Sequence, residues 1–443
     1  MLNRIFTLFL FVWVSFAWTQ NGFEIKSNRK KVTIPFKLVN NLIVVPVNVN
    51  GTNLNFLLDT GVSETLLFSL DETEQVKFEN IEKVRFTGLG NKEPFEGLKS
   101  SNNSLKIEDF VDLNHTLYIV LDQDINISSQ VGFPINGILG YHFFKNNPIE
   151  IKYKRNKIIV YDTIARVSKK IKKSYKKIPI SIEENKPYIQ SKVFLSDYEL
   201  NAKLLVDTGN SDALWLFQEK MGTIPIPEDN FVDFLGKGFS GNINGKRARL
   251  TSFVIDEFKF KKPLISFPDS LATSGISMVE NRIGSVGSEI MKRFNAVYDY
   301  KDKSIYLNKN DNFILPFNFN MSGLDVQHEG VQWVKEAYED MSTATSSQVS
   351  FESGDNKVVR NLKYKFELKP SYSILNIRKG SPADLAGLKE GDVIIKINSN
   401  FAYNYTLEEI KDILKSEEGK TITLEVERKG LPIKVKFQLK SII

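Results

Sequence analysis

Short runs of alternating apolar and polar residues are the main pattern of the chain. PVNVNGTNLNFLL from Pro46 and YIQSKVFLSDYELNAKLLV from Tyr188 are two such runs, and Val, Ile, Phe and Tyr are frequent in runs of this kind. A period of two places successive side chains on opposite faces of a strand, and turn residues between the runs separate the strands. Helical patterns here are brief and fall at residues 140–145 and 287–294. The pattern predicts a mainly β fold.

Two halves of the chain follow the same plan. Each has an apolar run that ends in Asp-Thr-Gly, any residue and Ser, and Asp59 precedes Asp207 by 148 residues. Further on, the steps GILG and GSVG end in Gly140 and Gly287, which are 147 residues apart. The offset of 148 also relates the glycines of FTGLGN to those of FLGKGFSGN, which are Gly88, Gly90, Gly236 and Gly238. Features that recur at one offset indicate a duplicated unit.

Changes in composition suggest where the domains begin and end. We predict two pseudo-symmetric β-lobes at residues 21–165 and 181–312, joined by a basic linker at 166–180. The linker contains VSKKIKKSYKK, which shows no apolar period and is interpreted as a solvated segment rather than a membrane or nucleic-acid patch. Residues 313–443 form a third region, with a polar loop or insertion near 342–360.

The third region combines helical and strand patterns. Pro382 stands where a short helix begins, a position at which its missing N–H is not needed. VIIKIN reads as a strand, and LEEIKDILKSEEG reads as a helix with Leu407, Ile410 and Leu414 on one face. TITLEVERKG and LPIKVKFQL are the closing strands. A small α+β domain is therefore expected.

Length and composition set further bounds. The chain has 443 residues, which suggests about three domains, and its formal charge of +6 is small for that length. No nucleic-acid partner is implied. The absence of cysteine excludes disulfides, zinc–thiolate sites and a cysteine nucleophile.

The first residues are typical of a secretory signal peptide. Arg4 precedes an apolar run from Ile5 to Trp18, and small residues follow at Ser15 and Ala17. We expect residues 1–20 to be removed, with no stable transmembrane span left, although an uncleaved interfacial anchor is the alternative. An exported chain without cysteine favours a bacterial location, in the periplasm, at the cell surface or outside the cell.

Motifs for other chemistries are missing from the sequence. It contains no HExxH, no GxSxG elbow and no phosphate-binding GxxxxGK[ST] loop. The three histidines, His115, His142 and His328, are scattered and are interpreted as surface or packing residues. We expect no metal and no cofactor.

Asp59 and Asp207 are the candidate catalytic residues. An acid at the end of an apolar run is drawn toward the interior, where a carboxylate without a partner is costly. Two carboxylates close together cannot both ionise easily, so one keeps a proton. The ionised member can then act as a general base, and the protonated member as a general acid.

The paired Asp-Thr-Gly motifs resemble those of the aspartic peptidases, and the size of each half resembles the retropepsin-like branch. The resemblance covers residues 31–307. It implies that Asp59 and Asp207 hold one water between two fused lobes. It assigns supporting roles to the two loops: Thr60 and Thr208 brace them, Gly61 and Gly209 allow their close approach, and Ser63 and Ser211 bond the outer carboxylate oxygens. It also places Gly88, Gly90, Gly236 and Gly238 in flap hairpins over a bound peptide.

The chain departs from the family pattern in three ways. Val62 and Asn210 follow the loop glycines, where the family more often has a small residue. Ser285 interrupts the second apolar-apolar-Gly step, which implies a weaker loop contact. Trp215 has no counterpart in the first half. No departure removes a catalytic atom.

The run GSPADLAGLKEGDVI resembles a PDZ domain of the bacterial kind. PDZ domains bind an extended peptide as an added edge strand, with backbone N–H groups holding its terminal carboxylate. The resemblance assigns this role to the loop 369–374, with Ser371, Tyr372, Ser373 and Ile374 as peptide-binding residues. The loop lacks the usual glycine, so a structural or interlobe role is equally open.

The sequence therefore predicts an exported aspartic endopeptidase with two retropepsin-like lobes and a C-terminal PDZ domain, acting on peptides or unfolded proteins. The alternative is a non-catalytic peptide-binding protein that uses the cleft and the PDZ domain as an adaptor. A latent enzyme whose flaps open when the PDZ domain binds a peptide ligand is a further hypothesis.

Overall fold

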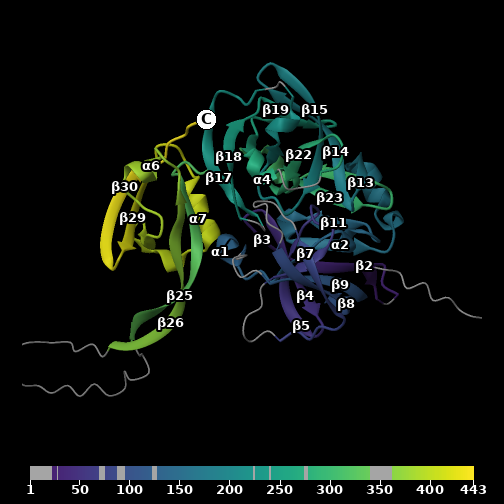
Figure 1. Cartoon of the computed structure of the whole chain (residues 1–443), viewed down its shortest axis with the longest axis horizontal. Helices are drawn as coiled ribbons and strands as arrows, with labels where there is room; N and C mark the ends of the chain where they lie inside the picture. Colours follow the sequence, from purple (N-terminus) through teal and green to yellow (C-terminus); the bar gives the residue numbers. More distant parts are fainter. Residues whose placement is uncertain are drawn as a thin grey trace, which may run out of the picture.

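The structure is a computed structural model of the chain, and it describes residues 22–26, 28–68, 75–86, 95–121, 127–222, 225–238, 241–273, 278–339 and 362–443. The predicted signal segment at 1–20 and the predicted polar insertion at 342–360 lie outside these residues. Figure 1 shows a large two-lobed body with a smaller domain at one side. Among the described residues, no helix is both long and apolar enough to cross a bilayer.

The first lobe is built on a β-sheet with the order β1-β9-β6-β10-β5-β4-β8-β7, and β3 pairs with β4. Its strands are β1 (Glu24–Ile25), β3 (Lys37–Val39), β4 (Leu42–Val49), β5 (Thr52–Leu58), β6 (Thr65–Leu67), β7 (Ile81–Phe86), β8 (Phe95–Ile107), β9 (Phe110–Val120) and β10 (Gly137–Leu139). Short helices α1 (Ile127–Val131) and α2 (Tyr141–Phe144) complete it. The alternating pattern has its expected effect, since every second residue of β4 from Ile43 to Val49 is fully buried.

The second lobe repeats this arrangement. Its strands are β14 (Lys186–Leu195), β15 (Tyr198–Asp207), β16 (Leu214–Leu216), β17 (Asn230–Gly238), β18 (Gly241–Arg249), β19 (Ser252–Ile255), β20 (Phe258–Lys261), β21 (Leu264–Pro268) and β22 (Arg282–Gly287), with helices α4 (Ser270–Thr273) and α5 (Ser288–Met291). In the first lobe β5 runs parallel to β10, and in the second β15 runs parallel to β22. The predicted duplication is therefore present in the topology.

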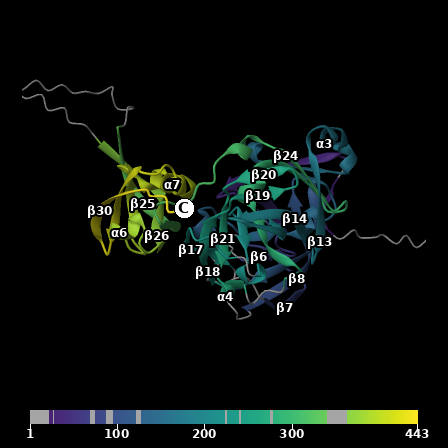
Figure 2. The ribbon, with the colours of Figure 1, turned by 90° about the horizontal axis from the view of Figure 1, so that it is seen from above.

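Six strands join the two halves. They are β2 (Lys31–Pro35), β11 (Ile149–Lys152), β12 (Lys157–Tyr161), β13 (Lys176–Glu183), β23 (Phe294–Asp299) and β24 (Ser304–Lys309). β11 of the first half pairs with β23 of the second, with Ile151 opposite Ala296. Figure 2 shows the two halves packed into one body. This shared sheet holds the lobes together independently of the two Asp-Thr-Gly loops.

The predicted linker at 166–180 is not a solvated segment. It contains helix α3 (Ser168–Ser174), and Lys176 already begins β13, which pairs with β24. Val167 and Ile171 are buried, and the Tyr175 hydroxyl donates to Glu150 Oε1 at 2.7 Å. These three residues are spaced by four, which is a helical period hidden among lysines.

The C-terminal domain has the predicted α+β composition. Its strands are β25 (Leu324–Glu339), β26 (Leu362–Ile377), β27 (Val393–Ile397), β28 (Asn400–Phe401), β29 (Thr421–Arg428) and β30 (Leu431–Gln438), and its helices are α6 (Pro382–Leu385) and α7 (Leu407–Leu414). Ser381 caps α6 ahead of Pro382, as the sequence pattern predicts. Thr406 and Glu409 form a capping box at the start of α7. The sheet order is β25-β26-β27-β29-β30, with β28 beside β27.

This domain contacts both lobes. β25 packs against α1 of the first lobe, and Lys411 Nζ of α7 donates to the Gln130 carbonyl at 2.9 Å. Gly132 lies so close to α7 that a Cβ there would be 2.6 Å from Leu407 Cβ. On the second lobe, β17 and β18 face the domain (Figure 1 and Figure 2).

Candidate active site

Asp59 and Asp207 lie at equivalent points of the two lobes. Asp59 directly follows β5, and Asp207 is the last residue of β15. The Asp59 N–H donates to the Leu139 carbonyl of β10 at 3.0 Å, and Asp207 is opposite Gly287 of β22. The parallel strand pair in each lobe therefore directs its aspartate toward the lobe interface.

Thr60 and Thr208 join the two loops through a reciprocal set of hydrogen bonds. The Thr60 N–H donates to Thr208 Oγ1 at 3.0 Å, and the Thr208 N–H donates to Thr60 Oγ1 at 3.1 Å. Each hydroxyl also donates across the interface, Thr60 to the Val206 carbonyl at 2.6 Å and Thr208 to the Leu58 carbonyl at 2.9 Å. Both side chains are almost fully buried, so water does not compete for these bonds. The bracing role assigned to these threonines is the one they have here.

Gly61 and Gly209 allow the carboxylates to meet. A Cβ on Gly209 would lie 2.1 Å from Asp59 Oδ2, and one on Gly61 would lie 2.9 Å from Asp207 Oδ1. Each glycine N–H also donates to the aspartate of its own loop, at 2.7 Å for Gly61 and 3.1 Å for Gly209. Each carboxylate thus lies against the glycine of the opposite loop, where no side chain fits.

The two carboxyl groups are electrostatically unequal. Burial and the neighbouring charge of Asp207 raise the pKa of Asp59 well above its usual value. Burial also raises the pKa of Asp207, but the positive charge of Arg282 opposes that rise. These influences favour the proton on Asp59 and the ionised form of Asp207.

Arg282, which the sequence analysis did not single out, is held firmly in the second lobe. Its Nη2 donates to Ser285 Oγ at 3.0 Å and its Nε to the Gly284 carbonyl at 3.2 Å. The guanidinium also lies over the Phe217 ring, 5.4 Å from its centroid. A charged residue at the start of the otherwise uncharged strand RIGSVG was the one available signal.

Ser285 does not weaken the loop contact as expected. β15 and β22 remain paired through this region, with Val206 opposite Val286. Behind the loop, the Ser288 N–H donates to the Asn210 carbonyl at 2.7 Å, and its hydroxyl donates to the Thr208 carbonyl at 2.9 Å. The Ser285 side chain serves instead as the acceptor for Arg282.

The roles assigned to Ser63 and Ser211 are wrong. The Ser63 hydroxyl donates to the Glu184 carbonyl at 2.8 Å, and Ser211 is exposed. Asp207 Oδ1 instead accepts the Asn210 N–H at 3.1 Å. In the second loop, the contact with the carboxylate is made by the backbone N–H of the residue directly after the glycine, one position before Ser211.

Two hairpins correspond to the predicted flaps. In the second lobe, Gly236 and Gly238 lie in β17, and Gly238 pairs with Gly241 at the far end of the β17–β18 hairpin. Gly236 has a φ of +145° at an irregularity in the pairing, a conformation that glycine adopts readily. In the first lobe β7 pairs with β8, but Gly88 and Gly90 lie outside the described residues.

A Thr-His-Asp arrangement near the first loop is structural. His115 Nε2 is 2.7 Å from Thr65 Oγ1, and its Nδ1 is 2.7 Å from Asp112 Oδ2. All three side chains are at least 95% buried, so a substrate has no access to the threonine hydroxyl. Burial lowers the pKa of His115, which keeps the ring neutral. His115 is thus a packing residue, as interpreted from the sequence.

The assigned PDZ peptide-binding residues do not lie at a free edge. Ser371, Tyr372, Ser373 and Ile374 belong to β26, which pairs with β25 on one side, while Ser373 pairs with Val393 of β27 on the other. A strand with two neighbours cannot accept a third. The sheet ends in β25 on the side of β26 and in β30 on the other side, so a peptide strand added next to the assigned residues would lie along β25. Next to this strand stand α7 and, from the first lobe, α1.

Comparison with known proteins agrees with this architecture. Residues 45–143 match a family described as aspartyl protease, and residues 373–428 match the PDZ domain family. Among solved structures, a crystal structure of the aspartic proteinase from Irpex lacteus aligns with a TM-score of 0.41 at 14% sequence identity, covering 64% of this chain and 99% of that one. No curated protein matches the sequence. The chain therefore combines an aspartyl-protease-like region, matched in its first lobe, with a C-terminal PDZ domain.

Proposed function

We propose that the protein is an aspartic endopeptidase that hydrolyses peptide bonds of peptides or unfolded proteins. The observation that carries the proposal is the contact between the two aspartates, each held against the glycine of the opposite loop. Two buried carboxyl groups this close together repel each other when both are ionised, so a purely structural role for the two loops does not explain the pair.

The unequal aspartates suggest separate roles. Asp207, whose ionised form is favoured by Arg282, would act as the general base that takes a proton from an attacking water. Asp59, whose pKa is raised well above its usual value, would donate a hydrogen bond to the scissile carbonyl. The proton that Asp207 takes from the water would then pass to the leaving nitrogen as the carbon–nitrogen bond breaks. The β17–β18 hairpin, with its counterpart β7–β8, would cover an extended substrate.

We also propose that the protein is exported, with the N-terminal segment as its signal and the periplasm or cell surface of a bacterium as its location. The support is the basic residue followed by an apolar run in residues 1–20. The PDZ domain would supply a second peptide-binding surface.

The test is cleavage of a complex peptide mixture, followed by mass spectrometry from about pH 3 to pH 8. Asp59→Asn and Asp207→Asn should each lower the cleavage rate by about 10²-fold or more, because each removes one of the two proton-transfer groups. Asp197→Asn, an exposed aspartate of the same lobe, should retain full activity.

Two results would count against the proposal. Cleavage that survives both substitutions would place the chemistry elsewhere. A folded wild-type protein that binds peptides without cleaving them at any pH would favour the adaptor alternative.

A further inference from the structure

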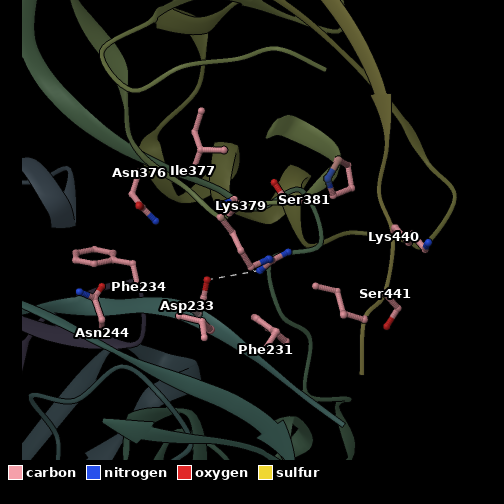
Figure 3. Close-up of a pocket in the computed structure, with 15 residues that line it drawn as sticks. Phe231, Asp233, Phe234, Asn244, Asn376, Ile377, Lys379, Ser381, Lys440 and Ser441 are labelled. Carbon is pink, nitrogen blue, oxygen red and sulfur yellow. Dashed lines mark ion pairs between the residues drawn. The ribbon is translucent and has the colours of Figure 1, made fainter. Parts of the chain in front are cut away.

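One ion pair crosses from the PDZ domain to the β17–β18 hairpin of the second lobe. Arg378 Nη1 lies 3.5 Å from Asp233 Oδ1, and the two side chains are only 6% and 13% exposed. The guanidinium also lies over the Phe231 ring of the same hairpin, 4.5 Å from its centroid. Figure 3 shows Asp233 and Phe231 on one side of a pocket of about 440 Å³, with Lys379 and Ser381 of the PDZ domain on the other.

The interaction continues from the hairpin toward the catalytic loop. Asp233 Oδ2 accepts Arg247 Nε at 2.7 Å, within the same hairpin. Arg247 Nη1 then donates to Asp212 Oδ2 at 3.0 Å. Asp212 belongs to the loop that follows Asp207, and it also accepts the Trp215 indole N–H at 2.8 Å.

Two further hydrogen bonds reach the catalytic carboxylate. The Asp212 N–H donates to Asn210 Oδ1 at 2.9 Å, and the Asn210 N–H donates to Asp207 Oδ1 at 3.1 Å. A continuous set of polar contacts therefore connects the PDZ domain, the hairpin and Asp207. The path is largely buried, so loss of one charge would leave its partner poorly solvated and free to shift.

We propose that Arg378 is a positioning residue, through which the PDZ domain holds the β17–β18 hairpin and the Asp207 loop in their working geometry. The consequence for catalysis rests on the proposed peptidase function, whereas the mechanical part does not. Asp233 lies between two guanidinium groups. With Arg378 gone it keeps only Arg247, and the hairpin loses its ion pair with the PDZ domain.

The mechanical part is tested by hydrogen exchange on the full chain carrying Asp59→Asn, so that peptidase activity plays no role. Arg378→Gln should increase exchange in residues 230–249 by about 5-fold or more, and Asp233→Asn should do the same from the hairpin side without touching the PDZ core. Lys379→Gln removes the same charge one residue away on the same pocket wall and should leave exchange unchanged. Unchanged exchange in both test variants would overturn the proposal.

The catalytic part is tested with the active protein. Arg378→Gln should lower kcat/KM by about 10-fold, through both a higher KM from the loosened hairpin and a lower kcat from the shifted loop. In a protein that already carries Asp233→Asn, adding Arg378→Gln should have little further effect, because both act through one contact. Equal and additive losses, or no loss, would show that Arg378 does not act through the hairpin. A wild-type protein without peptidase activity would refute the proposed function. The exchange experiment would then still test whether Arg378 holds the β17–β18 hairpin.

Discussion

Arg282 gives Asp59 and Asp207, the two candidate catalytic aspartates, different environments, although their motifs are nearly identical. The motifs DTGVS and DTGNS differ in one residue, and each loop has the same glycine and threonine contacts. The positive charge of Arg282 lowers the pKa of Asp207, whereas the neighbouring charge that acts most on the pKa of Asp59 is that of Asp207, which raises it. The Asn210 N–H, which donates to Asp207 Oδ1, acts in the same direction as Arg282.

Replacing Arg282 should therefore move the acidic limb of the activity profile. The positive charge of Arg282 lowers the pKa of Asp207, so Arg282→Gln should raise that pKa and shift the acidic limb of kcat/KM to higher pH, by about one pH unit. The measurement is kcat/KM against pH for both proteins. Arg282→Lys should restore part of the original profile, and an identical profile for all three would rule out this role of the charge.

At the scale of elements, the segment between the lobes shows how a composition signal can hide a structural one. Lysines dominate residues 167–177, but Val167 and Ile171 of this segment are buried with Tyr161, Val297 and Tyr306. The exposed lysines lie on the outer face of α3, and the residues spaced by four lie on its inner face.

Ile171→Asp should destabilise the two-lobed body by about 3 kcal/mol or more, because it buries an unpaired carboxylate in an apolar cluster. Denaturant unfolding followed by circular dichroism measures this loss. Lys169→Asp, an exposed position on the same helix, is the matched control and should change stability by no more than about 0.5 kcal/mol. Equal losses of stability at the two positions would show that Ile171 is not part of an apolar core and that α3 is a solvated linker.

At the scale of the whole molecule, the PDZ domain touches both lobes and carries a titratable group near one of these contacts. Burial, together with the negative charge of Asp233, raises the pKa of Asp325 on β25 to about 6. Asn376 donates to it at 2.8 Å, and the charges of Arg247 and Lys411 partly oppose the rise. The negative charges of Asp325 on β25 and Asp233 on the β17–β18 hairpin thus repel each other.

The sign of the pH effect follows from the raised pKa. A carboxyl group whose pKa is higher in the folded state binds more protons there, so its contribution to stability is present at low pH and is lost as pH rises through about 6. The loss is at most about 3 kcal/mol. The folded PDZ domain should therefore be more stable in acid than at neutral pH.

Asp325→Asn should remove this dependence and raise the unfolding midpoint at about pH 7.5 relative to wild type, with little change at about pH 4. Thermal unfolding at the two pH values measures the effect. Glu390→Gln, an exposed acid of the same domain, is the control. A wild-type protein that gains PDZ stability between pH 5 and pH 7 would contradict the assignment.

The sequence by itself determined the mainly β class, the duplication, the two aspartates with their threonines and glycines, and the PDZ signature. These features can be predicted from the sequence because they depend on local rules, which are strand periodicity, turn residues, and the absence of a side chain where two loops meet. The prediction for Ser63 and Ser211 failed on a local detail, because the backbone N–H of the preceding residue, Asn210, makes the contact with Asp207 that was expected from Ser211.

Only the tertiary structure decided what surrounds these residues. Arg282 beside Asp207, the path from Arg378 to Asn210, and the position of β25 at the sheet edge all depend on which strands lie next to each other. Arg378 and Asp233 are 145 residues apart in the chain and belong to different domains, and nothing in the motifs near them pairs one with the other. Ion pairs of this kind form between surfaces that exist only after each domain has folded, and their energies depend on burial that spacing along a chain does not specify.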